Sequence, residues 1–220
     1  MSIAKKKKLI KDQVIQKHGC QGIHCSKCIN IHRFIDKMAD SNIPVGYWKL
    51  GMNKFTGSDK LKEIATEYMS NLKNHYMKST SICLSGAQGT GKTMSSICIL
   101  KAAIRKGFSV YYITASDLQS EIFNYEINSI IKQVDFLAVD EVDSRFFVSE
   151  AQKLNFSGHF ENILRYRTHN EMPTIICTNE TESILNVFAG QCVRSIKSLF
   201  SQYVTVYPVS GKDFRQGRKQ

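Results

Sequence analysis

Apolar and polar positions along the chain follow two patterns, one typical of helices and one typical of buried strands. Over residues 61–76 the apolar positions recur at helical spacing, and Ser58 stands where an N-cap is expected, which predicts one amphipathic helix. Gly107 should end another helix, and the pair Ser116 and Gln119 resembles the capping box that opens a helix. The helices expected on these grounds cover residues 58–76, 93–106, 116–131 and 149–168.

Short runs rich in β-branched, aromatic and other apolar residues lie between these helices. Pro208 within the last run suggests a sheet edge or a strand end. Because strands alternate with helices, we expect an α/β fold with a parallel five-stranded sheet flanked by helices on both faces. The predicted strands cover residues 79–85, 108–114, 134–139, 174–177 and 203–209.

Length and composition set the limits of this prediction. The chain of 220 residues is long enough for one full α/β core and a small accessory module. It has no apolar run approaching the roughly 18 residues that a membrane span needs. The basic N-terminus lacks the apolar stretch and cleavage site of a secretory signal, so a cytoplasmic setting without membrane contact is expected.

Positive charge gathers at the two ends of the chain. Residues 1–50 carry ten basic side chains against three acidic ones, a net of +7 out of a total of +11. Residues 194–220 carry six basic side chains against one acidic one, a net of +5. This arrangement favours a polyanion partner, since Lys and Arg near phosphates release condensed counterions. The run from Lys5 to Lys8, taken alone, could equally be a solvated, frayed tail.

The segment Gly-Ala-Gln-Gly-Thr-Gly-Lys-Thr lies between a predicted strand and a predicted helix. Glycines there let backbone N–H groups approach phosphates, a Lys reaches the β and γ oxygens, and a hydroxyl binds Mg²⁺. This context is typical of a P-loop that binds ATP. The residues predicted to hold ATP are Gly86, Gly89, Thr90, Gly91, Lys92 and Thr93, with Thr93 also a ligand of Mg²⁺.

Polar side chains follow the third and fourth predicted strands, over residues 134–139 and 174–177. Asp140 should hold Mg²⁺, usually through water, and Glu141 should polarise the water that attacks the γ-phosphate. The two carboxylates could instead be solvated turn residues. Asn179 ends the following strand, where it could also cap the next helix.

Four blocks in order, at residues 113–118, 134–142, 165–167 and 172–179, resemble the DnaC/IstB group of AAA+ proteins. The resemblance covers roughly residues 43–215. It implies a P-loop AAA+ core without a full helical lid, because only about forty residues follow Asn179. It also implies three parts: a basic N-terminal module (1–50), a linker with an amphipathic helix (51–78) and the ATPase core (79–220). The small size and the Lys-rich ends resemble bacteriophage versions of the helicase loaders.

The resemblance also implies roles for particular residues. Asn179 matches the sensor that lies between the attacking water and the γ-phosphate. Arg194 matches the arginine finger that reaches the ATP of a neighbouring subunit, which implies a homo-oligomer, and Arg215 matches a terminal motif. Where the family usually carries a second arginine, this chain has Ser198 beside Lys197, so the second sensor has no clear candidate. Arg194 could also be a plain surface residue.

Three of the seven cysteines cluster in a polar stretch near the N-terminus. The spacing of Cys20, Cys25, Cys28 and His32 predicts a structural Zn²⁺ site, since a helix over residues 26–38 would place Cys28 and His32 on one face. His18 and His24 are competing ligands. The same cysteine spacing opens the plant-type ferredoxin pattern, so an iron–sulfur cluster and free thiols remain alternatives.

Members of the resembled group load replicative helicases or assist transposases. The resemblance therefore implies an ATPase that loads a hexameric replicative DNA helicase onto single-stranded DNA. Residues 1–50 would bind the helicase and the core would contact the DNA. Tyr47 and Trp48 could stack on bases or pack the linker onto the core. The rival functions are a transposase-helper ATPase of the IstB type and a nucleotide-dependent DNA-binding scaffold with little turnover.

Overall fold

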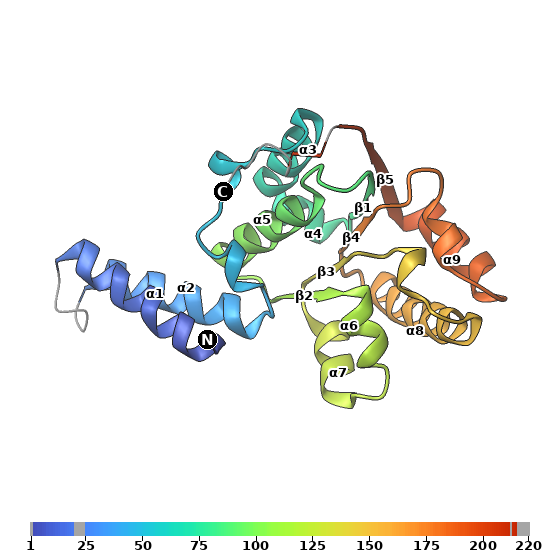
Figure 1. Cartoon of the computed structure of the whole chain (residues 1–220), viewed down its shortest axis with the longest axis horizontal. Helices are drawn as coiled ribbons and strands as arrows, with labels where there is room; N and C mark the ends of the chain where they lie inside the picture. The colour runs from blue at the N-terminus through green and yellow to red at the C-terminus, as the bar shows by residue number, and fades with distance from the viewer. Residues whose placement is uncertain (1, 20–24, 212, 215–220) are drawn as a thin grey trace.

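A computed structural model describes residues 2–19, 25–211 and 213–214 of the chain. Its described part contains a five-stranded sheet in the order β2-β3-β4-β1-β5 (Figure 1). Every neighbouring pair of strands is parallel, which confirms the predicted fold class. The strands are β1 (Ser81–Gly86), β2 (Val110–Thr114), β3 (Phe136–Asp140), β4 (Thr174–Thr178) and β5 (Val204–Val209).

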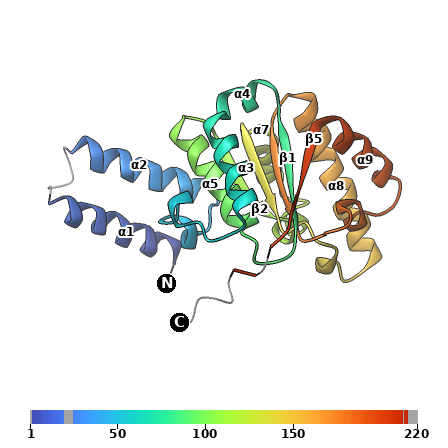
Figure 2. The ribbon, with the colours of Figure 1, turned by 90° about the horizontal axis from the view of Figure 1, so that it is seen from above.

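Helices cover both faces of the sheet, because successive strand side chains point to opposite sides. Ile82 and Leu84 of β1 pack into one apolar cluster, and Cys83 between them packs into the other. Figure 2 shows the resulting three layers. The first cluster includes α3 (Asp59–Ser70), α4 (Leu72–Met77) and α5 (Lys92–Arg105), and the second includes α6 (Ala115–Ser120), α7 (Tyr125–Gln133), α8 (Glu150–His169) and α9 (Cys192–Tyr203).

The end of the core is short. After β4 the described residues form η4 (Ile184–Val187), α9 and β5, without the helices of a full lid. Pro208 lies in β5 opposite Ser85, and β5 is an edge strand, as predicted. A proline is tolerated there because an edge strand has neighbours on one side only.

One predicted helix is wrong, because residues 116–131 form parts of two helices, α6 and α7. The Thr114 hydroxyl, and not Ser116, caps α6 by accepting from the Asp117 N–H at 3.1 Å. The Asn124 side chain caps α7 and accepts from the Ile127 N–H at 3.2 Å. These side-chain bonds to the backbone compete with a continuous helix, so they divide the segment.

The helix predicted over residues 58–76 is also divided. Asn71, with φ −106° and ψ 21°, separates α3 from α4, and its Nδ2 donates to Glu67 Oε1 at 2.8 Å. Ser58 occupies the N-cap position of α3, yet its side chain makes no capping bond among the described residues. The apolar periodicity continues across the break, so periodicity alone could not reveal it.

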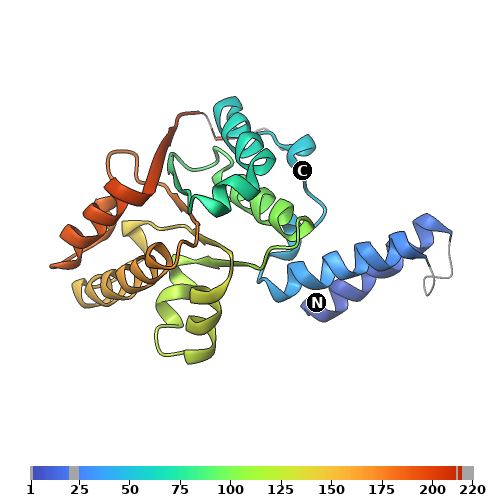
Figure 3. The same ribbon diagram turned by 180° about the vertical axis from the view of Figure 1, so that it is seen from behind.

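The N-terminal segment forms a helical hairpin of α1 (Ile3–His18) and α2 (Ser26–Asp40), which projects from one side of the core (Figures 1 and 3). Lys7 and Lys11 of α1 place their Nζ atoms 2.7 and 2.6 Å from Asp36 Oδ1 of α2. The run from Lys5 to Lys8 therefore lies within a helix and is not a frayed tail. Two short 3₁₀ turns, η1 (Val45–Tyr47) and η2 (Met52–Lys54), connect the hairpin to α3.

Candidate nucleotide site

The loop between β1 and α5 carries the predicted phosphate-binding residues. Gly89 and Gly91 have φ angles of +76° and +102°, in the left-handed region that favours glycine. A Cβ on Gly89 would lie 1.8 Å from Asp213 Oδ1, and a Cβ on Gly91 would lie 2.8 Å from the Phe55 ring. Glycine is therefore required at both positions. The loop leads directly into the N-terminus of α5, where helix N–H groups attract phosphate.

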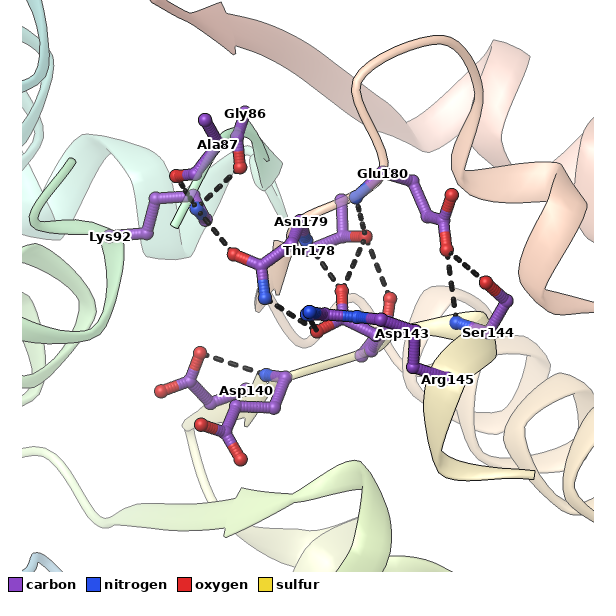
Figure 4. A network of polar contacts seen from close by, with 12 residues as sticks. Gly86, Ala87, Lys92, Asp140, Asp143, Ser144, Arg145, Thr178, Asn179 and Glu180 are labelled. Carbon is purple, nitrogen blue, oxygen red and sulfur yellow. Dashed lines mark hydrogen bonds and ion pairs between the residues drawn. The ribbon is translucent and has the colours of Figure 1, made fainter. Parts of the chain in front are cut away.

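Lys92 is the first residue of α5, and only 6% of it is exposed. Its Nζ donates to the carbonyl oxygens of Gly86 at 2.6 Å and Ala87 at 2.8 Å, and to Asn179 Oδ1 at 2.9 Å (Figure 4). The ammonium thus joins the ends of β1 and β4, which are neighbours in the sheet. A phosphate oxygen is charged and so is a stronger acceptor than these neutral oxygens. Lys92 is held where it can bind one.

Asp140 ends β3 beside this loop and is 2% exposed. Its Oδ2 accepts from the Tyr112 hydroxyl at 2.8 Å, and its Oδ1 accepts from the Glu141 N–H at 2.9 Å. Tyr112 comes from the neighbouring strand β2 and was not predicted as a site residue. Burial raises the pKa of Tyr112, and the adjacent carboxylate raises it further, so the phenol stays a donor at neutral pH. These two donors fix the direction of the Asp140 carboxylate.

Glu141 is exposed and has a φ of +56°, which is uncommon for a residue with a side chain. Such a conformation costs on the order of 1 kcal/mol and tends to persist where function needs it. The turn directs the chain away from β3 directly after Asp140, while Val142 N–H donates to the Cys177 carbonyl of β4. The predicted pair of carboxylates is therefore built of one buried, fixed member and one exposed member at a strained turn.

Asp143 is a buried carboxylate that the sequence prediction missed. It is 1% exposed, and its Oδ1 accepts from the Asn179 N–H at 2.6 Å. Its Oδ2 accepts from Asn179 Nδ2 and, at 3.1 Å, from Arg145 Nη2 (Figure 4). The Asp143 carboxylate accepts from the backbone N–H and from the side-chain Nδ2 of Asn179. The Asn179 Oδ1 is therefore directed at Lys92. The sequence signal that could have identified Asp143 is an acidic residue three positions after Asp140.

A cavity of about 460 Å³ lies in front of the loop, lined by Lys92, Thr93, Asp140, Glu141 and Asn179 among others. These residues fit a nucleoside triphosphate with Mg²⁺. The glycine turn leaves backbone close to the cavity, Lys92 offers an ammonium, and the Thr93 hydroxyl and the Asp140 carboxylate are oxygen ligands of the kind Mg²⁺ prefers. We call this cavity the nucleotide cleft.

Two further segments reach the nucleotide cleft, and neither was predicted. Tyr47 and Leu50, which precede α3, line it. Phe214, beyond β5, also lines it and donates its N–H to the Gly89 carbonyl at 3.2 Å. The walls of the cleft therefore come from both ends of the chain.

The predicted arginines lie elsewhere. Arg194 is an exposed residue of α9 and does not line the nucleotide cleft of its own chain. Arg215 lies outside the described residues. The structure brings together Lys92, Asp140, Glu141 and Asn179, and Arg194 lies exposed outside their cavity.

The predicted zinc ligands are not assembled in the described part of the chain. No group of three or more His, Cys, Asp or Glu residues there could hold a metal ion, and Cys20 lies outside the described residues. Cys28 is fully buried in α2, and His32 Nε2 lies 3.4 Å from the Lys11 carbonyl oxygen. The structure gives the zinc prediction no support. Elemental analysis of freshly purified protein tests it and the iron–sulfur alternative together.

Comparison with protein families adds a domain assignment. Residues 56–157 match the model of the family described as IstB-like ATP binding protein. No curated protein matches the chain significantly. Within the described residues, no helix is both long and apolar enough to cross a membrane.

Comparison with solved structures shows the fold. The chain is similar to DnaI, with 17% identity and a TM-score of 0.61 over 78% of this chain and 93% of that one. It is similar to the DnaC helicase loader, with 17% identity and a TM-score of 0.58 over 74% and 99%. It also resembles the replication initiator DnaA bound to AMPPCP and single-stranded DNA, with 19% identity and a TM-score of 0.57 over 76% and 51%. The chain thus spans about half the length of this DnaA structure.

The parallel sheet, the glycine loop with its lysine and the paired carboxylates are the features of a P-loop ATPase fold. Residues 56–157 of the chain match the IstB-like ATP-binding family model. The fold is shared with DnaC, DnaI and DnaA structures.

Proposed function

We propose that this ATPase loads a hexameric replicative DNA helicase onto single-stranded DNA. The observation that carries the proposal is the likeness in fold over 93% and 99% of the DnaI and DnaC helicase loader structures. A chain that contains the same core, preceded by a basic helical hairpin, suits the same task. The DnaA structure holds single-stranded DNA, which supports a similar ligand for the core of this chain.

The proposed chemistry assigns each residue of the nucleotide cleft a role. Backbone N–H groups of residues 86–91 and the Lys92 ammonium bind the β and γ phosphates. Thr93 and Asp140 hold Mg²⁺, which neutralises the phosphate charge when bound. Glu141 accepts a proton from the attacking water, and Asn179, held by Asp143, orients that water.

Arg194 completes the site in an oligomer. Because it is exposed and does not line its own cleft, we propose that it reaches the cleft of a neighbouring subunit. An arginine there stabilises the charge that spreads over the transferring phosphoryl oxygens. Hydrolysis would then depend on assembly, and single-stranded DNA would favour assembly. Residues 1–50 serve as the partner-binding module in this proposal.

A variant in which Glu141 is replaced tests whether the chain turns over ATP. Glu141→Gln should lower kcat by roughly 10²–10⁴-fold and leave ATP affinity unchanged. Glu182→Gln, an exposed carboxylate outside the cleft, is the matched control and should behave as wild type. If wild type binds ATP but shows no turnover with or without single-stranded DNA, the nucleotide-dependent scaffold takes the place of the loader.

Complex formation tests the partner. Glu141→Gln with ATP should form a stable complex with the hexameric helicase of the same replication system, measured by co-sedimentation. Lys92→Ala, which should bind ATP much more weakly, is the control and should form less complex. Absence of any complex, with both proteins folded, contradicts the loader proposal.

The family match favours a second candidate, a transposase-helper ATPase, because the matching model is IstB-like. The same co-sedimentation with a transposase of the same genetic element separates the two. ATP-dependent binding to the transposase, without binding to the helicase, would favour this candidate.

A further inference from the structure

Lys101 is a buried cation that the proposed chemistry does not use. It belongs to α5, the helix that begins at Lys92, and is 3% exposed. Its Nζ donates to the carbonyl oxygens of Tyr47 at 2.8 Å, Trp48 at 2.9 Å and Leu50. An ammonium has three N–H donors, so these three carbonyls can satisfy it completely.

Such a contact determines the shape of the segment that supplies the carbonyls. Burial lowers the pKa of Lys101 to about 8, so the ammonium is still mostly protonated at neutral pH. A buried ammonium without acceptors would be strongly unfavourable, so the three carbonyls must converge on it. We call residues 45–50 the strap. Lys101 holds the strap in place, because its side chain lies 51 to 54 positions further along the chain and binds three carbonyls of the strap.

The strap separates two cavities. Tyr47 and Leu50 line the nucleotide cleft. Trp48 and Lys49 line a groove of about 1020 Å³ between the helical hairpin and α5, which we call the N-terminal groove. Lys49 Nζ donates to Gln13 Oε1 of α1 at 2.7 Å, and Trp48 Nε1 donates to the Ile43 carbonyl at 2.7 Å. Tyr47 and Leu50 therefore face the nucleotide cleft, and Trp48 and Lys49 between them face the N-terminal groove.

The N-terminal groove, which the strap connects to the nucleotide cleft, is a basic surface. The apolar residues Ile31, Phe34 and Trp48 are part of its lining. Arg105 of α5 lies over the Phe34 ring, with its Cζ atom 4.4 Å from the ring centroid. Among the described residues, the lining of the groove contains basic side chains and no acidic one. The basic side chains are Lys27, Arg33, Lys37, Lys49 and Arg105. A change in the strap would alter this surface directly.

We propose that Lys101 is a positioning residue of the nucleotide site, which holds the strap as one wall of the nucleotide cleft and thereby makes the N-terminal groove respond to ATP. The proposal rests on the proposed ATPase function, since it takes ATP as the occupant of the cleft. ATP binding moves or rigidifies the strap from its Tyr47 and Leu50 side. The surroundings of Trp48 and Lys49, on the other side of the strap, then change.

Trp48 offers a direct test, because it is the single tryptophan of the chain and belongs to the strap. ATP titrated into wild type should shift or quench its fluorescence emission, with calorimetry of the same samples giving the ATP affinity. Lys101→Met keeps the aliphatic stem and removes the donors. It should red-shift the emission without nucleotide, abolish the ATP-dependent change and raise the Kd and KM for ATP about fivefold or more. Its kcat should change by less than about twofold, since the phosphate-binding residues are untouched.

The controls separate the possible failures. Lys106→Met removes an exposed lysine at the end of the same helix and should behave as wild type. Lys101→Arg, which keeps N–H donors, should restore part of the ATP-dependent emission change. No ATP binding by wild type in calorimetry contradicts the proposed ATPase function. ATP binding with an unchanged Trp48 emission overturns the strap proposal alone, and this measurement needs no variant. An ATP affinity of folded Lys101→Met equal to that of wild type also overturns it.

Discussion

Lys92 and Arg167 are buried cations at opposite ends of the strands of one parallel sheet. Lys92 lies at the carboxyl ends, where its ammonium contacts the glycine loop and Asn179 beside an open cleft. Arg167 of α8 is fully buried near the amino ends of β3 and β4. Its guanidinium donates to the carbonyl oxygens of Val134 at 2.8 Å, Ile131 at 2.9 Å and Pro173 at 2.7 Å.

The two contact sets differ in whether the acceptors can be exchanged. The acceptors of Arg167 are backbone carbonyls, the Thr174 hydroxyl and the Met172 sulfur, which are enclosed by the fold. Burial lowers its pKa to about 9, so the guanidinium stays charged at neutral pH. Lys92 faces a cleft where a phosphate oxygen can compete for the ammonium. Burial of a cation by itself is therefore no sign of function, whereas a cation with replaceable acceptors in a cleft is one.

The largest effect should follow from Arg167→Met, which leaves several buried carbonyls without a donor. We expect a loss of about 3–5 kcal/mol in the free energy of unfolding, measured by urea denaturation. Arg165→Met is the matched control. It removes a half-exposed ion pair with Glu161 and should change the free energy by at most about 1 kcal/mol. Equal losses in the two variants would contradict the comparison.

Lys92→Met should show the reverse profile. The free energy of ATP binding should become less favourable by about 2–3 kcal/mol, because a charge-assisted hydrogen bond to phosphate is lost. The free energy of unfolding should change by less than about 1 kcal/mol, since the carbonyls beside the cleft can bind water. Calorimetry with ATP and urea denaturation of the same preparation check both numbers. A large loss of stability with intact ATP affinity would make Lys92 a structural residue like Arg167.

Asp143→Asn should have the smallest effect of the three and sharpens the account of Asn179. An amide in place of one carboxylate oxygen would present N–H groups to Asn179 Nδ2 and Arg145, which are donors themselves. We expect kcat to fall about tenfold with little change in KM, because the orientation of Asn179 is lost. Steady-state kinetics measure this, with the exposed Asp12→Asn as the control for charge. An unchanged kcat would show that Asp143 does not position Asn179.

Local signals predicted much of the core. Gly89, Gly91 and Lys92 carry a motif whose meaning depends on a strand before it and a helix after it, and both are present. Four of the strands were found because buried parallel strands are largely apolar runs. The largely exposed β5 was found from its β-branched and aromatic residues. The break between α6 and α7 was also a local matter, at Thr114 and Asn124, and was misread because two capping signals competed for one segment.

Other features had no local signal. Tyr112 meets Asp140 from 28 positions away, and Asp143 meets Asn179 from 36. The strap is built by Lys101 in the same way. The roles of these side chains depend on which strands and helices become neighbours, and a single sequence does not state that.

By itself, then, the sequence determined the alternation of strands and helices, the phosphate-binding loop and the pair Asp140 and Glu141, because turn chemistry, apolar runs and motif spacing act between residues close in the chain. Only the tertiary structure decided what surrounds them. It joined Lys92 to Asn179, separated Arg194 from the cleft and set the strap between two cavities. Those contacts form when distant segments exclude water together, and burial then requires each polar group to find its partner there.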